Sequence, residues 1–442
     1  MRVAVVGGGI SGLAAAFYIK RFRPQAEVVL LEREGRLGGT MRTVEMEGFH
    51  FEAGSNGFLT NKPDTLDLVR DSGGEPLLMR SNDAARIRYI FTDRLHRLPE
   101  DPIRFIRTRL LSLRGKLRVL GELVTPARRD GPEETLRDFG YRRVGREFTD
   151  VFLDAMCAGI FASTPDRISV NAAFPLVVRL EREYGGLFRG MLKKRKKQAG
   201  PGGVLMSFVR GVSTFIEHLG RTLRADIRLG TGVTGLMREG DAWRLTTSTG
   251  EVVADRVVLA GPAYVSAGLL APVDGDIARG LQRIEYSPVA VIGLGYDRLS
   301  HPLDGFGLLT TTSARKPILG VLWDSSIFPD RAPPGKKSLR VMIGGQRNPD
   351  LAARDAEALI ALALRGVEET MGVTESPAVT FVQRWEHGIP NYPLGHLANV
   401  DAVFERVRQH PGLYLTSNAY YGIGLNDCVA QARACAERVA HD

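Results

Sequence analysis

The hydrophobic pattern is clearest at the amino end of the chain, where it predicts a strand, a helix and a second strand in close succession. Residues 3–6 and 28–31 are short apolar runs, and an Ala-rich apolar stretch lies between them. Short apolar runs bounded by turn residues are typical of buried strands, and strands that alternate with helices predict a parallel sheet. The chain therefore opens with a predicted βαβ unit of an α/β fold.

A glycine-rich turn joins the first predicted strand to the helix. Glycines with the spacing G-x-G-x-x-G permit a tight turn, close approach of the backbone to a pyrophosphate, and close packing of the helix on the strand. Glu32 ends the second strand, where a carboxylate can accept the hydroxyl groups of an adenosine ribose. Together with the free N–H groups at the start of the helix, this arrangement predicts a dinucleotide site. The turn consists of Gly7, Gly8, Gly9, Ile10, Ser11 and Gly12.

The residues just after Glu32 indicate which dinucleotide binds. Gly38, Gly39 and Thr40 follow the acidic residue closely. A glycine pair at this place resembles flavoproteins of the amine-oxidase type more than nicotinamide-dependent dehydrogenases. The predicted cofactor is FAD.

Two later segments have patterns that fit the same nucleotide-binding domain. From Val233 onward apolar and polar residues alternate as in a β-hairpin, and a buried strand then ends at Ala260-Gly261-Pro262. Near the carboxyl end, a strand at 413–416 is followed by a second glycine turn and a closing helix. The amino end of that helix can point N–H groups at the flavin end of the cofactor. The nucleotide-binding domain is therefore predicted to be discontinuous.

Between these parts lies a stretch with a different pattern. From residue 102 to 124 apolar residues recur at spacings of three and four, with arginines and lysines between them. This pattern predicts amphipathic basic helices, which Gly115 and Gly121 are expected to divide. Two interpretations stay open: the apolar face packs on the rest of the protein, or part of it docks on anionic lipid. A second basic block at 193–197, followed by glycines and a proline at 200–203, is predicted to be an exposed loop, either a solvated charge run or part of the same lipid-facing surface.

The composition narrows the class of protein. A chain of 442 residues exceeds one ordinary core, so two or three domains are expected. The hydrophobic content of 44% and charged content of 25% are typical of a globular protein. Cys157, Cys428 and Cys435 are too few and too scattered for a disulfide framework or a zinc site, so we interpret them as core thiols in a reducing compartment.

Charge and targeting signals favour a cytoplasmic protein with an anionic partner. The formal net charge is +9, but no nucleic-acid recognition motif accompanies it. An anionic membrane surface or a polycarboxylate substrate therefore fits better than a nucleic acid. The first predicted strand begins at residue 3, which leaves no room for a signal peptide, and no apolar run is long enough to span a bilayer. We expect a cytoplasmic protein that associates peripherally with the inner face of the cell membrane.

Segments throughout the chain resemble the oxygen-dependent protoporphyrinogen oxidase family of the haem pathway. The amino-terminal signature is shared with monoamine oxidases and phytoene desaturases, whereas 328–333 and 389–396 are far more specific to porphyrinogen oxidases. The resemblance covers essentially the whole chain. Its segments are 51–57, 158–162, 172–175, 322–333, 384–396 and 421–428.

This resemblance implies three domains. A discontinuous Rossmann-like FAD-binding domain would comprise residues 1–80, 210–262 and 405–442. A mixed-sheet substrate domain would comprise 81–98 and 263–404, and a helical, basic, membrane-binding insertion would comprise 99–209. The amphipathic stretch from 102 lies where this insertion is expected. A homodimer stays open, because the sequence does not define the oligomeric state.

The resemblance also implies the residues of the site. Phe306 and Leu309 would enclose a pyrrole ring, and Met342 and Gly159 would line the same pocket. Arg88 would lie near a propionate, with a surface ion pair as the alternative. No metal ligand is expected. The implied cofactor-binding residues are Gly7, Gly8, Gly9, Ile10, Ser11, Gly12, Glu32, Gly38, Gly39, Thr40, Gly54, Ser55, Asn56, Gly57, Val233, Trp385, Ile423, Gly424 and Leu425.

The implied reaction is the six-electron oxidation of protoporphyrinogen IX to protoporphyrin IX, with O2 as acceptor and H2O2 as product. No catalytic side chain is implied, because the flavin N5 carries the chemistry. This agrees with a sequence in which no hydrolytic or metal-binding motif stands out. Two alternatives stay open. One is oxidation of coproporphyrinogen III to coproporphyrin III on the same fold, and the other is a non-catalytic FAD-fold protein that binds porphyrin or lipid.

Overall fold

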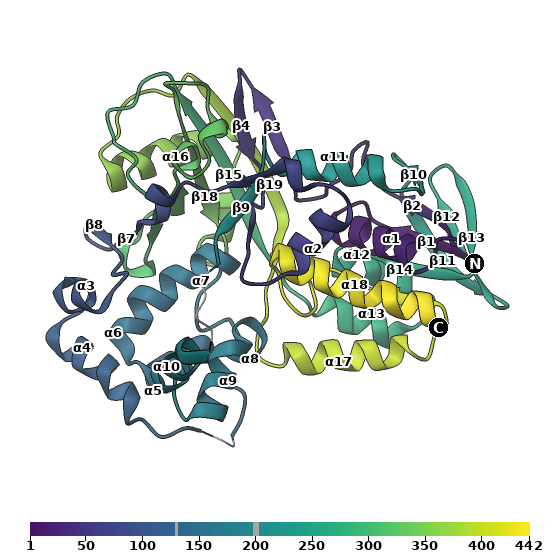
Figure 1. Ribbon diagram of the computed structural model, residues 1–442, viewed down its shortest axis with the longest axis horizontal. Coiled ribbons are helices and arrows are strands. Elements are labelled where there is room, and N and C mark those ends of the chain that lie inside the picture. The colour runs from purple at the N-terminus through teal and green to yellow at the C-terminus, as the bar shows by residue number, and fades with distance from the viewer. Residues whose placement is uncertain (129–130, 198–202) are drawn as a thin grey trace.

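A computed structural model describes residues 1–128, 131–197 and 203–442, with only the backbone for 194–197. It is a mixed α/β fold, as the sequence predicts. Figure 1 shows a parallel sheet between helices, a larger sheet beside it, and a group of helices at the lower left. Both chain termini lie at the end of the parallel sheet that is far from this helical group.

The first sheet has five parallel strands in the order β10-β2-β1-β14-β20. Strand β1 lies in the middle, and its side chains enter two cores: Val3 and Val5 enter one, and Ala4 enters the other. Burial on both faces explains why this strand is a continuous apolar run in the sequence. The strands are β1 (Arg2–Val6), β2 (Glu27–Leu31), β10 (Asp226–Arg228), β14 (Arg256–Leu259) and β20 (Leu413–Leu415).

Other elements cover both faces of the parallel sheet. Helices α1, α11 and α18 form a core on one face, and α1 and α18 lie side by side. The other core contains helices α12, α13 and α17 and the antiparallel meander β11-β12-β13, which is the predicted hairpin with one further strand. Their bounds are α1 (Ile10–Phe22), α11 (Val212–Thr222), α12 (Ala263–Leu270), α13 (Gly275–Gln282), α17 (His396–Val407), α18 (Leu425–His441), β11 (Val233–Glu239), β12 (Ala242–Thr247) and β13 (Gly250–Ala254).

The second sheet has seven strands in the order β19-β15-β18-β17-β16-β7-β8. Its strands pair antiparallel except β16 and β7, which are parallel. Helix α16 (Ala356–Met371) and the short α15 (Pro349–Ala352) close a core on one face. The strands are β7 (Arg88–Phe91), β8 (Leu95–Arg97), β15 (Tyr286–Tyr296), β16 (Gly307–Thr310), β17 (Ile318–Leu322), β18 (Lys337–Gly344) and β19 (Val379–Pro390).

The two sheets meet where the hairpin β3 (Thr43–Met46) and β4 (Phe49–Glu52) lies on the second sheet. Gly293 and Gly295 of β15 make room for this contact, because a Cβ atom at either position would come within 3.0 Å of the ring of Phe51 or Phe49. Two glycines in a buried strand therefore mark a close approach between elements distant in sequence.

Short elements complete this part of the fold. A small antiparallel sheet has the order β5-β9-β6 and joins the chain on either side of the helical group. Its strands are β5 (Phe58–Leu59), β6 (Leu78–Arg80) and β9 (Leu205–Phe208), and the short helices are α2 (Asp64–Asp71), η1 (Glu75–Leu77), η2 (Asp83–Arg86), η5 (Thr312–Ala314), α14 (Asp324–Ile327) and η6 (Pro329–Arg331).

The helical group contains α3 to α10, all between residues 102 and 197. The predicted break at Gly121 is correct, because α4 ends there. The predicted break at Gly115 is wrong: Gly115 lies inside α4, where its N–H donates to the N-cap Ser112 and the helix packs against Glu147. The elements are α3 (Pro102–Arg107), α4 (Leu113–Leu120), η3 (Gly121–Leu123), α5 (Leu136–Arg143), α6 (Arg146–Phe148), η4 (Thr149–Leu153), α7 (Asp154–Phe161), α8 (Val170–Ala173), α9 (Pro175–Tyr184) and α10 (Leu187–Lys197).

The basic block at 193–197 is not the predicted loop. It forms the last part of α10, which begins at Leu187, because lysine and arginine continue a helix at little cost. Residues 200–202 of the predicted loop lie outside the described residues. Within the described ranges, none of the helices combines the length and apolar character that crossing a bilayer needs. All three cysteines are buried and free, as predicted.

Buried charges hold the helical group together. Arg143 is fully buried and forms ion pairs with Glu122, also fully buried, and with Glu181. Arg142 binds the same Glu181 and also Glu134, at 2.6 and 2.7 Å. Because a buried charge is costly unless it is paired, these contacts fix the helices relative to one another.

Candidate cofactor and substrate site

Two helices begin at the same edge of the parallel sheet. α1 follows β1 directly, and α18 follows β20 after one turn. Because both strands are parallel, their carboxyl ends and the amino ends of the two helices lie at that edge. Free N–H groups and the positive ends of two helix dipoles therefore face one region, which suits an anionic ligand.

The glycines of the first turn have different tasks. Gly7 has φ +109°, and a Cβ atom on Gly12 would lie 1.9 Å from the Gly7 carbonyl oxygen, so no other residue fits at Gly12. The N–H of Gly38 donates to the Gly8 carbonyl at 2.8 Å, and this bond joins the pair Gly38 and Gly39 to the first turn. At Gly9, by contrast, a Cβ atom would meet no protein atom within 4 Å. The turn is packed everywhere except at Gly9, where a ligand can approach the backbone.

Glu32 lies beside the turn with both carboxylate oxygens bound to backbone. Oε2 accepts from Gly8 N at 2.6 Å and Oε1 accepts from Glu34 N at 2.8 Å. Each oxygen keeps a further acceptor position for a hydroxyl group. The Glu32 carbonyl accepts from Thr231 N at 2.8 Å, so Val233, two residues further on, starts β11 close to the same place.

The loop 54–57 follows β4 at the junction of the two sheets. A Cβ atom on Gly54 would lie 2.2 Å from the Thr40 carbonyl oxygen, and one on Gly57 would lie 2.1 Å from the carbonyl of Met206. Between them Asn56 buries both its amide nitrogen and its amide oxygen with no protein partner. A buried amide with neither atom satisfied indicates a missing polar ligand.

The second glycine turn caps α18. Gly424 is the N-cap, and its N–H donates to Asp427 at 3.2 Å, while Ile423 packs toward Tyr392 and the helical group. Leu425 enters the core that α1 and α18 share.

The Gly9 opening, the Glu32 carboxylate and the unpaired Asn56 amide fit a dinucleotide such as FAD. Gly7 to Gly12, Glu32 and Val233 would hold its adenosine diphosphate part, and Asn56 and Gly424 its flavin part.

All five residues expected to bind substrate lie on or against the second sheet. Leu309 pairs with Gly320, and Gly320 pairs with Met342. The three residues therefore lie in a row across β16, β17 and β18, and because the middle residue is a glycine, a gap separates the side chains of Leu309 and Met342. Gly159 of α7 lies over Leu309, because a Cβ atom on Gly159 would be 2.9 Å from Leu309 Cδ1. The side chains of Leu309 and Met342 are half-buried. They form an apolar wall with α7.

Phe306 and Arg88 lie at the other end of this wall. Phe306 immediately precedes β16, and Gly307 pairs with Arg88 of the neighbouring β7. The exposed Arg88 guanidinium lies over the half-buried Phe306 ring, 5.1 Å from its centre. No ion pair of Arg88 exists among the described residues, so the alternative of a surface ion pair is not what the structure shows. A cation beside an aromatic ring suits a ligand with an apolar body and a carboxylate.

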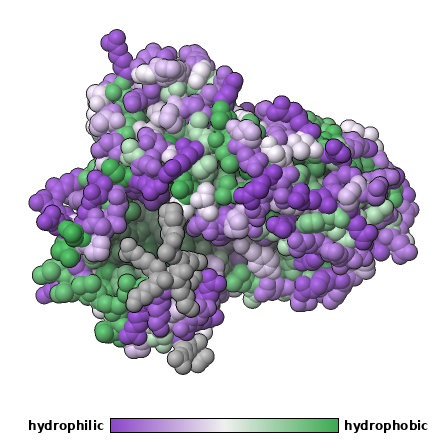
Figure 2. Space-filling model, viewed as in Figure 1, coloured by the Kyte–Doolittle hydropathy of each residue, from purple (hydrophilic) through white to green (hydrophobic). Residues whose placement is uncertain are grey.

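Trp385 joins the wall to the loop 54–57. Its indole Nε1 donates to the Ala53 carbonyl at 2.7 Å, and its ring packs both on the cluster with Phe51 and on the cluster that contains Met342. The space-filling view is hollowed between the helical group and the upper part of the molecule, with hydrophobic atoms inside the recess (Figure 2).

Sequence reasoning missed a buried ionic cluster at this junction. Glu52 pairs with Arg331 at 3.1 Å, and Arg340 pairs with Asp324 at 3.1 Å, and all four side chains are buried. Burial raises the pKa of the Glu52 carboxyl to about 7, although Arg331 and Arg340 oppose the shift. Burial likewise raises the pKa of Asp324. The available signal was a single charge inside an apolar run, as for Arg340 between Leu339 and Val341.

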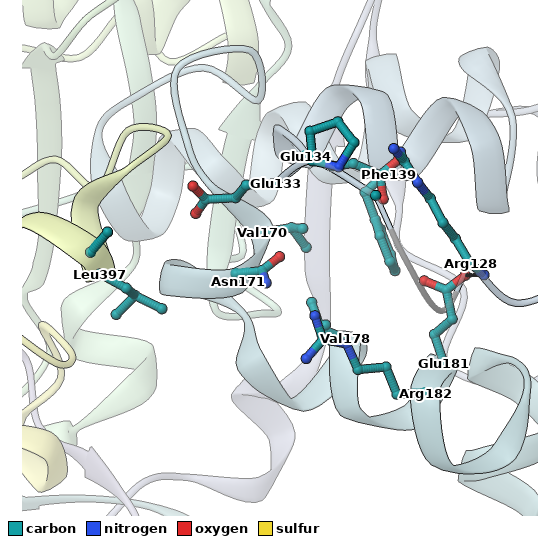
Figure 3. A pocket seen from close by; sticks show the side chains of 13 residues that line it. Arg128, Glu133, Glu134, Phe139, Val170, Asn171, Val178, Glu181, Arg182 and Leu397 are labelled. Carbon is teal, nitrogen blue, oxygen red and sulfur yellow. Dashed lines mark hydrogen bonds and ion pairs between the residues drawn. The ribbon is translucent and has the colours of Figure 1, made fainter. Parts of the chain in front are cut away.

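Two further cavities lie away from these residues. One, of about 270 Å³, lies between the helical group and α17, where Arg128, Glu134 and Glu181 meet beside Arg182 (Figure 3). The other, of about 570 Å³, has a polar lining that includes the basic side chains of Arg315, Arg347 and Arg365. Neither contains any of the expected cofactor-binding or substrate-binding residues.

Comparison with known proteins identifies the family. The model of the flavin containing amine oxidoreductase family matches residues 10–440. The chain belongs to this family. It is an FAD-dependent oxidase, as the sequence predicts.

Its relatives include porphyrinogen oxidases along the full length of the chain. Protoporphyrinogen oxidase of Bos taurus is 31% identical, with 99% of this chain and 98% of the relative covered. Coproporphyrinogen III oxidase of Bacillus subtilis (strain 168) is 29% identical, with 98% and 96% covered. A crystal structure from Exiguobacterium sp. 255-15, provisionally named a protoporphyrinogen oxidase, has a TM-score of 0.89 and 31% identity, with 99% and 98% covered. The resemblance to porphyrinogen oxidases is confirmed.

A Gly9→Ala substitution tests the opening in the first turn. Gly9 has φ −70° and ψ 176°, which alanine adopts freely, and its methyl group would meet no protein atom. We expect the apoprotein to unfold at the wild-type temperature but to bind FAD at least about tenfold more weakly, equivalent to ~1.4 kcal/mol. Gly35→Ala, also in open space, is the control and should bind FAD normally. Wild-type FAD affinity in Gly9→Ala would contradict the assignment.

The raised pKa of Glu52 predicts a pH-dependent difference in stability. A carboxyl whose pKa rises from 4.5 to about 7 on folding binds its proton more tightly in the folded state. Its contribution to stability is therefore fully present below about pH 4.5 and is lost as the pH rises to about 7. In Glu52→Gln this loss is absent, so the variant should gain up to about 3 kcal/mol relative to the wild type between pH 4.5 and 7.5. Urea unfolding across this range measures the difference, and a constant difference would refute the shift.

Proposed function

We propose that the protein oxidises protoporphyrinogen IX to protoporphyrin IX, with O2 as electron acceptor and H2O2 as product, in porphyrin biosynthesis. The observation that carries the proposal is the contact made by Trp385. It places the apolar wall of Leu309 and Met342 next to the loop of Asn56, where the flavin part of FAD would lie. A flat, largely apolar substrate can therefore lie against the wall with its edge toward the flavin.

The residues of this chain bind and orient the substrate. Phe306, Leu309 and Met342 cover apolar ring surface, and Arg88 holds a propionate. FAD, when bound, supplies the electron-accepting chemistry. Removal of six hydrogen atoms from the porphyrinogen, in three two-electron steps, reduces three molecules of O2 to three of H2O2. The task of the protein is orientation and exclusion of water, which explains a wall without acidic or basic side chains apart from Arg88.

The charge of the wall favours protoporphyrinogen IX over coproporphyrinogen III. Protoporphyrinogen IX has two propionates on adjacent rings, and coproporphyrinogen III has four around the macrocycle. Among the expected substrate-binding residues only Arg88 is cationic, and the others are apolar or glycine. The Bacillus subtilis relative, a coproporphyrinogen III oxidase, keeps the second substrate as the alternative.

A side-by-side assay tests the proposal. The FAD-loaded protein is mixed with each reduced porphyrinogen in air, and porphyrin fluorescence, O2 uptake and H2O2 are followed. We expect a higher kcat/KM for protoporphyrinogen IX and one H2O2 for each O2 consumed. A preference for coproporphyrinogen III would establish the alternative, and no porphyrin from either would refute the function.

Phe306→Ala extends the same assay to the wall. Loss of the ring removes apolar contact and the surface on which Arg88 lies, so kcat/KM should fall at least about tenfold while FAD content stays unchanged. Phe105→Ala, at a half-buried phenylalanine in the helical group, is the control. Equal loss of activity and FAD in Phe306→Ala would show that the ring is only structural.

We also propose that α3 and α4 contact an anionic membrane surface. Ile103, Ile106, Leu113 and Leu117 are 60–73% exposed, and Figure 2 shows hydrophobic surface at the lower left, where Figure 1 places these helices. Three exposed arginines beside them, Arg107, Arg109 and Arg114, have no ion pair among the described residues. Exposed apolar side chains ringed by basic ones suit the interface of an anionic bilayer.

Vesicle sedimentation tests this contact. Leu113 and Leu117 lie one turn apart on the same face of α4, so Leu113→Glu/Leu117→Glu places two negative charges in the contact. Binding to phosphatidylglycerol-containing vesicles should fall at least about tenfold. Met237→Glu, at a similarly exposed position on β11, should bind as the wild type does. Undiminished binding of the double variant would refute the surface.

A further inference from the structure

The backbone carbonyls of residues 52, 53 and 54 accept hydrogen bonds from side chains of the seven-stranded sheet. Nη1 of Arg340 donates to the carbonyl oxygens of Glu52 at 3.1 Å and Gly54 at 3.0 Å. Between them, the Ala53 carbonyl accepts from Trp385 Nε1 at 2.7 Å. The segment that leads into the loop 54–57 is therefore anchored by β18 and β19, and not only by its own hairpin.

The guanidinium of Arg340 is itself held in place. Nη2 donates to Asp324 Oδ1 at 3.1 Å, and both side chains are buried. The peptide N–H of Ala53 donates to the Arg42 carbonyl at 2.8 Å, and Arg42 reaches back to Gln383 of β19 at 3.1 Å. Several hydrogen bonds that converge on one short segment of backbone favour a single geometry for it.

Arg340 also belongs to the strand that forms the substrate wall. Met342 lies two residues further along β18, so the two side chains leave the strand on the same face. Strand β18 thus carries both Arg340, which binds the segment before the flavin-facing loop, and Met342, which is part of the wall. A movement of the loop or of the wall would change the distance between the loop and the wall.

We propose that Arg340 is a positioning residue that fixes the flavin-facing loop 54–57 at a set distance from the substrate wall. The proposal rests on the proposed function for its effect on turnover, but the anchoring itself does not. Arginine suits the task because its planar fork binds two carbonyls and a carboxylate at once. A lysine can keep the charge beside Asp324 without reaching the same three oxygens.

Hydrogen–deuterium exchange tests the anchoring without any substrate. Arg340→Lys keeps a cation beside Asp324, and Arg340→Met/Asp324→Asn removes both buried charges, so neither leaves a charge unpaired. In the FAD-loaded protein and in the apoprotein we expect at least about tenfold faster exchange of the amides of 54–58 in the double variant. The amides of β1 and α1 should exchange as in the wild type. Unchanged exchange of 54–58 in both variants would overturn the proposal.

Separate half-reactions test the effect on turnover. Reduction of the bound flavin by porphyrinogen without O2 should slow about tenfold or more, because small misplacements of reacting groups carry large rate costs. Reoxidation by O2, FAD content and KM should stay within about twofold of the wild type. A parallel loss of FAD affinity and of both half-reactions would show a merely structural role and overturn the proposal.

Arg347→Lys is the matched control. Arg347 is also buried and paired with a carboxylate, Asp154, and it also donates to backbone carbonyls, but those belong to Thr310 and Asp154 rather than to 52–54. It should leave the exchange of 54–58 unchanged. If the wild type is reduced by no porphyrinogen, the proposed function fails, and the exchange measurement still decides whether Arg340 anchors the loop.

Discussion

The contact between the two sheets is the constraint on which the rest of the molecule depends. The parallel sheet and its helices carry the glycine turns that fit a dinucleotide, and the seven-stranded sheet carries the apolar wall. The two are useful only if they meet at a fixed distance. They meet where β4 lies on Gly293 and Gly295 and where Arg340 and Trp385 bind the carbonyls of 52–54.

The ionic cluster at this contact fixes the position of the backbone at 52–54 more than it adds to the stability of the fold. Burying Glu52, Arg331, Asp324 and Arg340 carries a desolvation cost, and the raised pKa values of the two acids are the sign of it. Apolar residues of similar volume often give equal or greater stability at such places. They would, however, leave the carbonyls of Glu52 and Gly54 without donors. Charged side chains therefore hold an irregular segment of backbone that no regular sheet could hold.

The cofactor side was predictable from sequence because it is made of backbone. At Gly12 a side chain would collide with the carbonyl of Gly7, and the order of strand, glycine turn, helix and acid at Glu32 follows from that local geometry. The discontinuous parallel sheet was predictable for a similar reason, because β14 and β20 are short apolar runs before turns. Local rules gave these elements without knowledge of the rest of the chain.

The wall and the ionic cluster could not be derived in that way. Leu309 and Met342 become neighbours only through the pairing of β16, β17 and β18, and the gap between them is a glycine on a third strand. Arg340 and Glu52 are nearly 290 positions apart, and only the packing of β4 on β15 brings them together. The basic block at 193–197 was misread because helix formation depends on the residues before it, from Leu187 onward. Resemblance to a family supplied the wall residues, whereas Arg340 and Asp324 emerged only from the structure.

The glycine turns and the apolar wall differ in how many substitutions they tolerate. A side chain at Gly7 would strain the backbone of the first turn, and one at Gly12 would collide with it, so few substitutions are tolerated there. Phe306, Leu309 and Met342 are half-buried side chains whose neighbours are mostly other side chains, and their size can vary without moving the strands that carry them. If the proposed function and the proposed role of Arg340 hold, selectivity between porphyrinogens can shift through the wall while Arg340 keeps the wall at its distance from the cofactor. The fixed part of the site and the variable part are joined by Arg340 and Met342 of β18 and by Trp385 of β19.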